Sequence, residues 1–246
     1  MSKFYTNTYS SINLHKKSSN KSEIVTQMIY GDSFSIIKKN KKWIKIKIKE
    51  DGYRGYILNK NYSLYFKPTH KIQKLKVNVY KFPNKRRKIN ILPFGSKIRI
   101  KEKKFKFVKF DKGWISQNDI KPLKFKEKNI FRRIKYFRNT KYKWGGKSFK
   151  GIDCSALVQI CFNFNNRFCP RDTKDQIKYF KNNVNIKNLK KNDIIYWKGH
   201  VAIALSKKNL IHAYGQMKKT LIMETKKTIK KIKDTANLKV LSIKRI

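Results

Sequence analysis

The chain has 246 residues, of which 39% are hydrophobic, and a formal net charge of +49. This length can hold two or three small domains, each with its own core. Its three cysteines are odd in number and fall in one region, which argues against a disulfide framework. No apolar run resembles a secretory signal or a transmembrane helix, so we expect a cytoplasmic protein without membrane insertion.

The positive charge by itself would suggest a nucleic-acid or anionic-membrane partner. Lysine and arginine, however, occur in nearly every segment, and isoleucine and asparagine are also abundant, as in AT-rich coding sequences. No recognisable nucleic-acid module is present, so we predict no specific nucleic-acid partner. The charge should still attract acidic ligands in general.

The first half contains a diverged internal repeat. Residues 12–16 resemble residues 77–81, and residues 55–57 resemble residues 113–115, in the same order at a spacing of about sixty residues. Within each copy, apolar and polar residues alternate, most strictly over residues 43–49, as in half-buried strands. Several short strands in such a unit predict a small β-barrel.

The prolines suggest the domain boundaries, because Pro68 and Pro122 each lie just after one copy of the repeat. We therefore predict one small β-barrel over residues 1–67, a second over residues 68–122, and a third domain over residues 123–246.

The third domain has helical patterns followed by strand patterns, an order typical of α+β folds. Helices are predicted at residues 130–137, 155–164 and 173–180, and strands at residues 193–197, 200–205 and 210–213. His200 and His212 then lie on neighbouring strands near a turn. Both can point toward the start of the helix that follows Asp153.

Cys154 has the sequence context of a nucleophile. Gly151 and Asp153 predict a turn and a helix N-cap, which places the thiol in the first helical turn. Unpaired amides and the helix dipole favour an anion there, so we expect a lowered thiol pKa. Cys161, seven residues later, is interpreted as core filler. No C-x-x-C or H-x-x-x-H pair occurs, and no metal site is predicted.

Five short motifs follow one another in the second half, at residues 142–146, 151–155, 171–173, 199–201 and 211–213. Together they resemble the motifs of the NlpC-type, papain-like cysteine peptidases, which cleave bacterial cell-wall peptides. The first half resembles the paired bacterial SH3 domains that one branch carries. The resemblance implies an α+β fold, a papain-like catalytic domain behind two SH3-like barrels, and no cofactor.

The resemblance also implies the catalytic roles. Cys154 would be the nucleophile, and His200 the base that takes the thiol proton and later protonates the leaving amine. His212 would hold the His200 imidazole in orientation. Tyr142 would stabilise the oxyanion together with the Cys154 backbone amide, although aromatic packing is an alternative for this side chain.

Substrate contacts are implied for a second set of residues. Asp172 would bind the α-ammonium of the substrate by charge pairing, its alternative being the N-cap of the following helix. Ser155 would contact the acyl side, and Trp144 would be a wall or a contact. Arg171 and Thr173 belong to the Asp172 motif and are grouped with it.

Two residues of the first barrel complete the implied substrate site. Glu23 and Tyr53 match positions that close the amine end of the cleft in one branch, the γ-D-glutamyl-L-diamino acid endopeptidases. A departure is Gly199, where some relatives have a second histidine directly before the catalytic one.

We therefore expect a peptidase that releases L-Ala-D-Glu from muropeptides with a free N-terminal L-Ala. Its partner would be a peptidoglycan-derived peptide, and its oligomeric state stays open. One alternative is a wall-lytic endopeptidase acting on intact peptidoglycan. The other is an inert, basic SH3-type binding protein.

Overall fold

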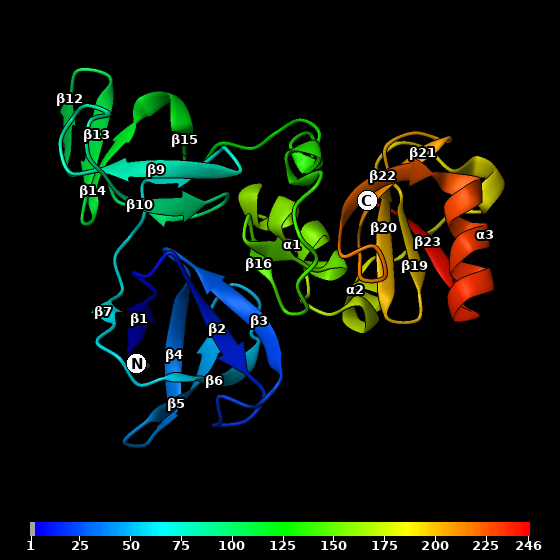
Figure 1. Ribbon diagram of the computed structural model, residues 1–246, viewed down its shortest axis with the longest axis horizontal. Helices are drawn as coiled ribbons and strands as arrows, with labels where there is room; N and C mark the ends of the chain where they lie inside the picture. The colour runs from blue at the N-terminus through cyan, green and yellow to red at the C-terminus, as the bar shows by residue number, and fades with distance from the viewer. Residues whose placement is uncertain (1–2) are drawn as a thin grey trace. The chain divides into compact units, whose positions relative to one another are not determined.

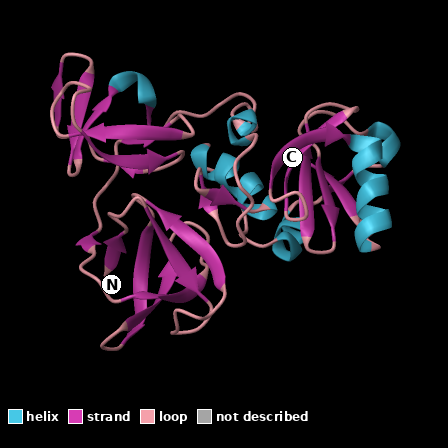
Figure 2. Cartoon of the chain, viewed as in Figure 1, coloured by secondary structure: helices cyan, strands magenta, loops and turns pink. Residues whose placement is uncertain are grey.

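The computed structural model describes residues 3–246, which form two compact units (Figure 1). The first comprises the chain up to Lys126 with two short segments, Lys147–Phe149 and Phe164–Asn166, and the remaining residues form the second. Strands dominate the first unit, whereas all three α-helices begin in the second (Figure 2). This content confirms the predicted α+β class.

The first repeat forms a seven-stranded antiparallel sheet in the order β3-β2-β6-β5-β4-β1-β7. Its strands are β1 (Phe4–Thr6), β2 (Ser11–His15), β3 (Ile24–Ile29), β4 (Ser33–Lys39), β5 (Trp43–Ile48), β6 (Arg54–Leu58) and β7 (Ser63–Leu64). The alternation seen in the sequence is that of β5, where Ile44, Ile46 and Ile48 are buried and Lys47 is exposed. These isoleucines form a core with Leu14 and other apolar residues of the same sheet.

The second repeat forms two smaller sheets, in the orders β10-β9-β14-β13-β12 and β11-β8-β15. The strands are β8 (His70–Ile72), β9 (Lys76–Tyr80), β10 (Lys88–Pro93), β11 (Lys97–Ile98), β12 (Glu102–Lys104), β13 (Phe107–Phe110), β14 (Gly113–Ser116) and β15 (Ile120–Pro122), with a 3-10 helix η1 (Gln117–Asp119) before β15. Tyr30 of the first repeat is fully buried in the core of the second. The domain boundaries at residues 67 and 122 stay a prediction.

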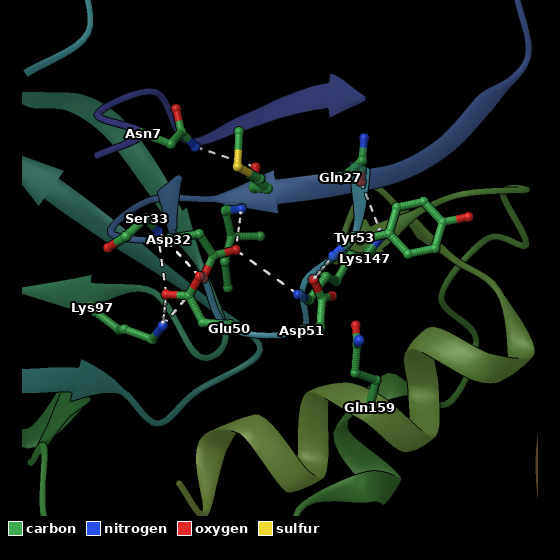
Figure 3. Close-up of polar contacts among 12 residues, drawn as sticks. Asn7, Gln27, Asp32, Ser33, Glu50, Asp51, Tyr53, Lys97, Lys147 and Gln159 are labelled. Carbon is green, nitrogen blue, oxygen red and sulfur yellow. Dashed lines mark hydrogen bonds and ion pairs between the residues drawn. The ribbon is translucent and has the colours of Figure 1, made fainter. Parts of the chain in front are cut away.

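A buried charge cluster joins the two repeats within the first unit (Figure 3). Lys97 of β11 places its Nζ 2.6 Å from Glu50 Oε1 and 3.4 Å from Asp32 Oδ1. The Ile29 amide donates to Asp32 Oδ2, and the Ser33 amide donates to both Glu50 oxygens. Burial raises the pKa of Glu50, while the two carboxylates raise that of Lys97 despite its own burial. Each of the two groups, Lys97 and Glu50, is therefore stabilised in its charged form by the other.

Lys71 of β8 is a second buried cation in the first unit. Its ammonium donates to the carbonyl oxygens of Phe125, at 2.6 Å, and Phe164. Phe164 is the last residue of helix α1 (Cys154–Phe164), so this contact satisfies a carbonyl at a helix C-terminus, where a cation is favoured.

The second unit is built on a six-stranded sheet in the order β18-β23-β19-β20-β21-β22. Its strands are β18 (Asn182–Asn183), β19 (Ile194–Trp197), β20 (His200–Ala204), β21 (Asn209–Tyr214), β22 (Lys219–Glu224) and β23 (Ser242–Arg245). The other elements of this part of the chain are η2 (Ile134–Phe137), β16 (Lys147–Ser148), β17 (Gly151–Ile152), α2 (Thr173–Tyr179), η3 (Ile186–Asn188) and α3 (Thr225–Ala236); of these, β16 belongs to the first unit.

One predicted helix, over residues 130–137, is wrong. The segment consists of turns ending in the single 3-10 helix η2, because its amides bond three residues back, as Ile134 does to the Phe131 carbonyl. The other predicted elements of this domain are present within two residues of their expected ends. Within residues 3–246, no helix has the length and apolar character needed to cross a membrane.

We expect Lys97→Met to lower the free energy of unfolding by about 3–5 kcal/mol at neutral pH, because it leaves two buried carboxylates facing each other. The loss relative to wild type should shrink as the pH falls, since protonation of Glu50 relieves the repulsion. Denaturant unfolding at several pH values measures this.

The matched control is Lys109→Met, which removes one partner of the exposed Lys109–Glu102 pair and should change stability little. A Lys97→Met loss that stayed constant with pH, or equalled that of the control, would contradict the role given to the buried cluster.

Candidate active site

Asp153 fixes the start of helix α1. Its Oδ1 accepts from the Ala156 amide at 2.8 Å, the N-cap bond that the sequence predicted, and its Oδ2 accepts from the Gly145 amide at 2.9 Å. Arg171 donates to both oxygens, at 3.0 Å and 2.6 Å, in a bidentate pair whose side chains are 2% and 7% exposed. The residue before the thiol is therefore held from three directions.

Ser155 and Arg171 are part of this network. The Ser155 hydroxyl lies 3.2 Å from Asp153 Oδ1 and accepts from Arg171 Nη1 at 2.8 Å. Gln176 of α2 donates to the Ser155 carbonyl, which ties the network to the second helix. Both side chains thus support the helix start, and their contact with substrate stays a prediction.

The Cys154 thiol lies against the turn between β19 and β20. Its Sγ is 4.0 Å from the Gly199 carbonyl oxygen, and the Val201 amide hydrogen-bonds to the same sulfur. Burial, and secondarily the Asp153 charge, raise the pKa of Cys154 to about 12, although the amides of Val201 and Ser155 oppose this. The expected lowering by the helix start is therefore outweighed, and at neutral pH the group is a thiol.

Gly199 allows the tight turn that presents this carbonyl. Its φ of +74° lies in the left-handed region, which favours glycine.

His200 and His212 are brought together by the sheet register. Ile203 pairs with Ile211, so the register sets Ala202 opposite His212 and leaves His200 diagonal to it on the same face. His200 Nε2 lies 2.9 Å from His212 Nδ1. His200 stands between Gly199 and Val201, both of which contact the thiol sulfur through their backbone, so the backbone of His200 lies beside Cys154. The action of its ring on the thiol stays a prediction.

Met223, on a third strand, continues the row of contacting side chains formed by His200 and His212. His212 pairs with Leu221 of β22, which places Met223 on the same face, and His212 Nε2 lies 3.3 Å from Met223 Sδ. Burial lowers the pKa of His200 to about 4, and burial together with His200 lowers that of His212 to about 3. Both rings are neutral at pH 7.

Tyr142 lies beside the thiol. Burial, then the Cys154 and Asp153 charges, raise the pKa of its phenol, which therefore keeps its proton. Its amide donates to the Lys218 carbonyl, and its ring packs on Gly215, where a Cβ would come within 3.4 Å. The phenol can thus act as a neutral donor, and its contact with an oxyanion stays a prediction.

The remaining predicted residues differ in setting. Asp172 occupies the N-cap position of α2, as the alternative had it; its carbonyl accepts two helix amides, and its side chain makes no capping hydrogen bond. Thr173 is the first residue of α2, and Trp144 is 59% exposed. Their contact with substrate stays a prediction.

Glu23 and Tyr53 belong to the first unit. Glu23 forms an exposed pair with Lys16, and Tyr53 packs against the core of the seven-stranded sheet. Their predicted role at the amine end of the cleft stays a prediction. No group of three or more His, Cys, Asp or Glu within residues 3–246 is arranged to hold a metal ion.

The sequence did not predict a role for Gln176 or Met223, and it predicted only the helix N-cap for Asp153. A buried pairing of Asp153 with Arg171 could have been suspected, because only 14 acidic residues occur against 63 basic ones and this one directly precedes the predicted nucleophile. Met223 carries no such signal, since only the strand register brings it to His212.

We expect Arg171→Met to lower the free energy of unfolding by about 3–5 kcal/mol, because it leaves the Asp153 carboxylate buried without its partner. Lys230→Met, which breaks the exposed Lys230–Asp234 pair on α3, is the matched control and should leave stability nearly unchanged. Denaturant unfolding compares them, and equal effects would contradict the importance given to the buried pair.

Two family models match the chain. Residues 139–236 match the NlpC/P60 family, and residues 14–61 match the bacterial dipeptidyl-peptidase Sh3 domain. Dipeptidyl-peptidase 6 of Lysinibacillus sphaericus is 30% identical over 99 residues, which are 40% of this chain and 36% of that protein. A probable endopeptidase NlpC homolog of Haemophilus influenzae is 33% identical over 78 residues, 30% of this chain and 42% of that protein. The matches thus span less than half the length of either relative.

Solved structures share the fold over nearly the whole chain. An NlpC/P60 family protein from Bacillus cereus aligns with a TM-score of 0.79 over 99% of both chains at 18% identity. An NlpC/P60 endopeptidase from Photobacterium damselae subsp. piscicida aligns with a TM-score of 0.63, over 97% of this chain and 70% of that one, at 11% identity. The resemblance predicted from the motifs is confirmed: the chain carries a bacterial dipeptidyl-peptidase SH3 domain followed by an NlpC/P60 domain.

Proposed function

We propose that the chain is a cysteine peptidase that hydrolyses the bond after γ-D-Glu in L-Ala-γ-D-Glu-diamino acid peptides. The observation that carries the proposal is the contact of the Cys154 sulfur with the backbone on both sides of His200, whose ring is bonded to His212. Related proteins are a dipeptidyl-peptidase and a probable endopeptidase, which supports peptide hydrolysis as the reaction class.

The hydrogen-bond chain across the sheet assigns the tautomers. A thioether sulfur accepts but cannot donate, so the proton at the 3.3 Å contact belongs to His212 Nε2. A neutral imidazole carries one N–H, and His212 Nδ1 is then an acceptor for the N–H at His200 Nε2. This leaves a lone pair on His200 Nδ1, the state that a general base for the thiol requires.

Catalysis would begin with proton transfer from the Cys154 thiol to His200 Nδ1 as the sulfur attacks the carbonyl carbon. The Cys154 amide and the Tyr142 hydroxyl would donate to the oxyanion. Return of the proton from His200 to the leaving amine yields a thioester and releases the diamino acid side. Water, deprotonated by His200, then attacks the thioester and frees the thiol.

Charge supports the substrate class. A free α-ammonium at L-Ala would pair with Asp172, and the carboxylates of D-Glu and the diamino acid suit a chain with a net charge of +49. We propose that Trp144 lines the amine end, and the role implied for Glu23 and Tyr53 stays a prediction. Cleavage of imported wall fragments in the cytoplasm would follow from this choice of substrate.

We expect Cys154→Ala to lower release of L-Ala-D-Glu from L-Ala-γ-D-Glu-diaminopimelate by more than about 10³-fold, whereas Cys161→Ala, a second buried thiol, should keep most activity. Product analysis by mass spectrometry measures both. Wild-type enzyme should cleave the N-acetylated peptide far more slowly. Equal cleavage of free and acetylated peptides would refute the dipeptide-releasing assignment and favour action on intact peptidoglycan.

We expect Met223→Leu to lower kcat by about two- to tenfold, the worth of one ordinary hydrogen bond, with KM nearly unchanged. Met217→Leu, at an exposed methionine of the same unit, is the control. The ¹⁵N shifts of His212 should report an Nε2–H tautomer in wild type and a tautomer mixture in Met223→Leu. An unchanged tautomer with lowered kcat would rule out this positioning role.

A further inference from the structure

One pocket of the second unit is lined by basic side chains. Its volume is about 380 Å³, within the range of small-molecule sites. Five cationic residues line it: Lys128, Arg167, Lys190, Lys191 and Arg245. One carboxylate side chain, that of Asp193, opposes them, so the side chains of the lining keep a net charge of about +4.

The pocket lies at the far end of the elements that carry the thiol and the base. Cys154 begins α1, whereas Arg167 follows its last residue, Phe164, after a rise of about 16 Å. Asp193 precedes β19, and His200 lies beyond the other end of that strand, about 13 Å along it. A ligand here would therefore not compete with the peptide.

Asp193 organises the pocket and does not repel an anion from it. The side chain is 1% exposed, and its oxygens accept from Arg245 Nε at 2.9 Å, Arg245 Nη2 at 2.8 Å and the Lys190 amide at 2.7 Å. Its own amide donates to the Lys190 carbonyl, which closes the turn that presents Lys190 and Lys191. The one acidic side chain of the lining thus bonds the Arg245 guanidinium and the backbone of Lys190.

Arg245 is fixed further by a bond from its Nη2 to the Asn188 carbonyl at 2.9 Å. Arg167, at the C-terminal end of α1, lies over the Phe162 ring with 5.2 Å from its Cζ to the ring centroid. Two guanidinium groups are therefore held in place before any ligand arrives, which reduces the entropy that binding must overcome.

We propose that this pocket binds a small phosphorylated anion, with one or two phosphate groups, at a site separate from the peptidase centre. Phosphate carries up to two charges on oxygens that lysine and arginine recognise, and several converging cations suit it better than a single carboxylate. The proposal does not depend on the function proposed for Cys154.

The test is calorimetric titration of the full chain with sodium pyrophosphate, and separately with glycerol phosphate, at about 0.15 M salt. We expect saturable binding with one site per chain. The two ligands distinguish a diphosphate from a monoester as the recognised group.

The variant Lys128→Gln/Lys190→Gln/Lys191→Gln should weaken binding by more than roughly tenfold. Its matched control, Lys226→Gln/Lys233→Gln/Lys239→Gln, removes the same charge from exposed positions in and after α3 and should stay within about twofold of wild type. Both should retain the wild-type melting temperature.

Three outcomes would overturn the proposal. Equal weakening by the two triple variants would mean that the general charge of the chain binds the anion. Absence of saturation in the wild type with both ligands would mean that there is no site. Binding of a single-stranded oligonucleotide without binding of pyrophosphate would mean that the basic surface serves a polymer instead.

Discussion

The buried pair of Asp153 with Arg171 is the interaction on which the second unit depends. It closes the start of α1 through the Ala156 amide, holds the Gly145 loop, and reaches α2 through Ser155 and Gln176. The thiol is the next residue along, so its position is set by a carboxylate that substrate need not touch. Because a buried charge is costly without its partner, the arrangement has few alternatives of similar energy.

The protonation states of the site follow from the same burial. Desolvation raises the pKa of the thiol and lowers those of both histidines, so the resting centre holds no net charge on these three groups. In the function that we propose, a neutral thiol needs a base with a free lone pair, and the hydrogen bonds from His200 through His212 to Met223 would supply one by directing each N–H away from the sulfur. Reactivity would then depend on the tautomer of His200 more than on a thiolate stabilised by the helix.

The small number of acidic residues determines how the charges of the chain are paired. With 14 acidic and 63 basic residues, most cations have no carboxylate to pair with. The buried acidic residues instead stabilise the fold. Glu50 and Asp32 pair with Lys97 between the repeats. Asp153 pairs with Arg171 at the start of α1, and Asp193 pairs with Arg245 at a basic turn. A chain that uses its acids in this way leaves basic concavities open to anions from solution.

The sequence by itself determined the element types, the repeat, the N-cap and the family. Each of these depends on local pattern: alternation in β5, the Gly151–Asp153 turn, and the order of short motifs around Cys154 and the two histidines. The prediction of a helix over residues 130–137 was wrong because the spacing of apolar residues cannot distinguish an α-helix from successive three-residue turns.

Only the tertiary structure decided the thiol pKa, the partner of His212 and the pairing of Lys97. Each depends on burial or on strand register between residues far apart in sequence, such as Lys97 with Glu50 or the β21–β22 pairing that brings Met223 to His212. Local pattern carries no information on desolvation, and a shift of one residue in register would move Met223 to the other face of the sheet.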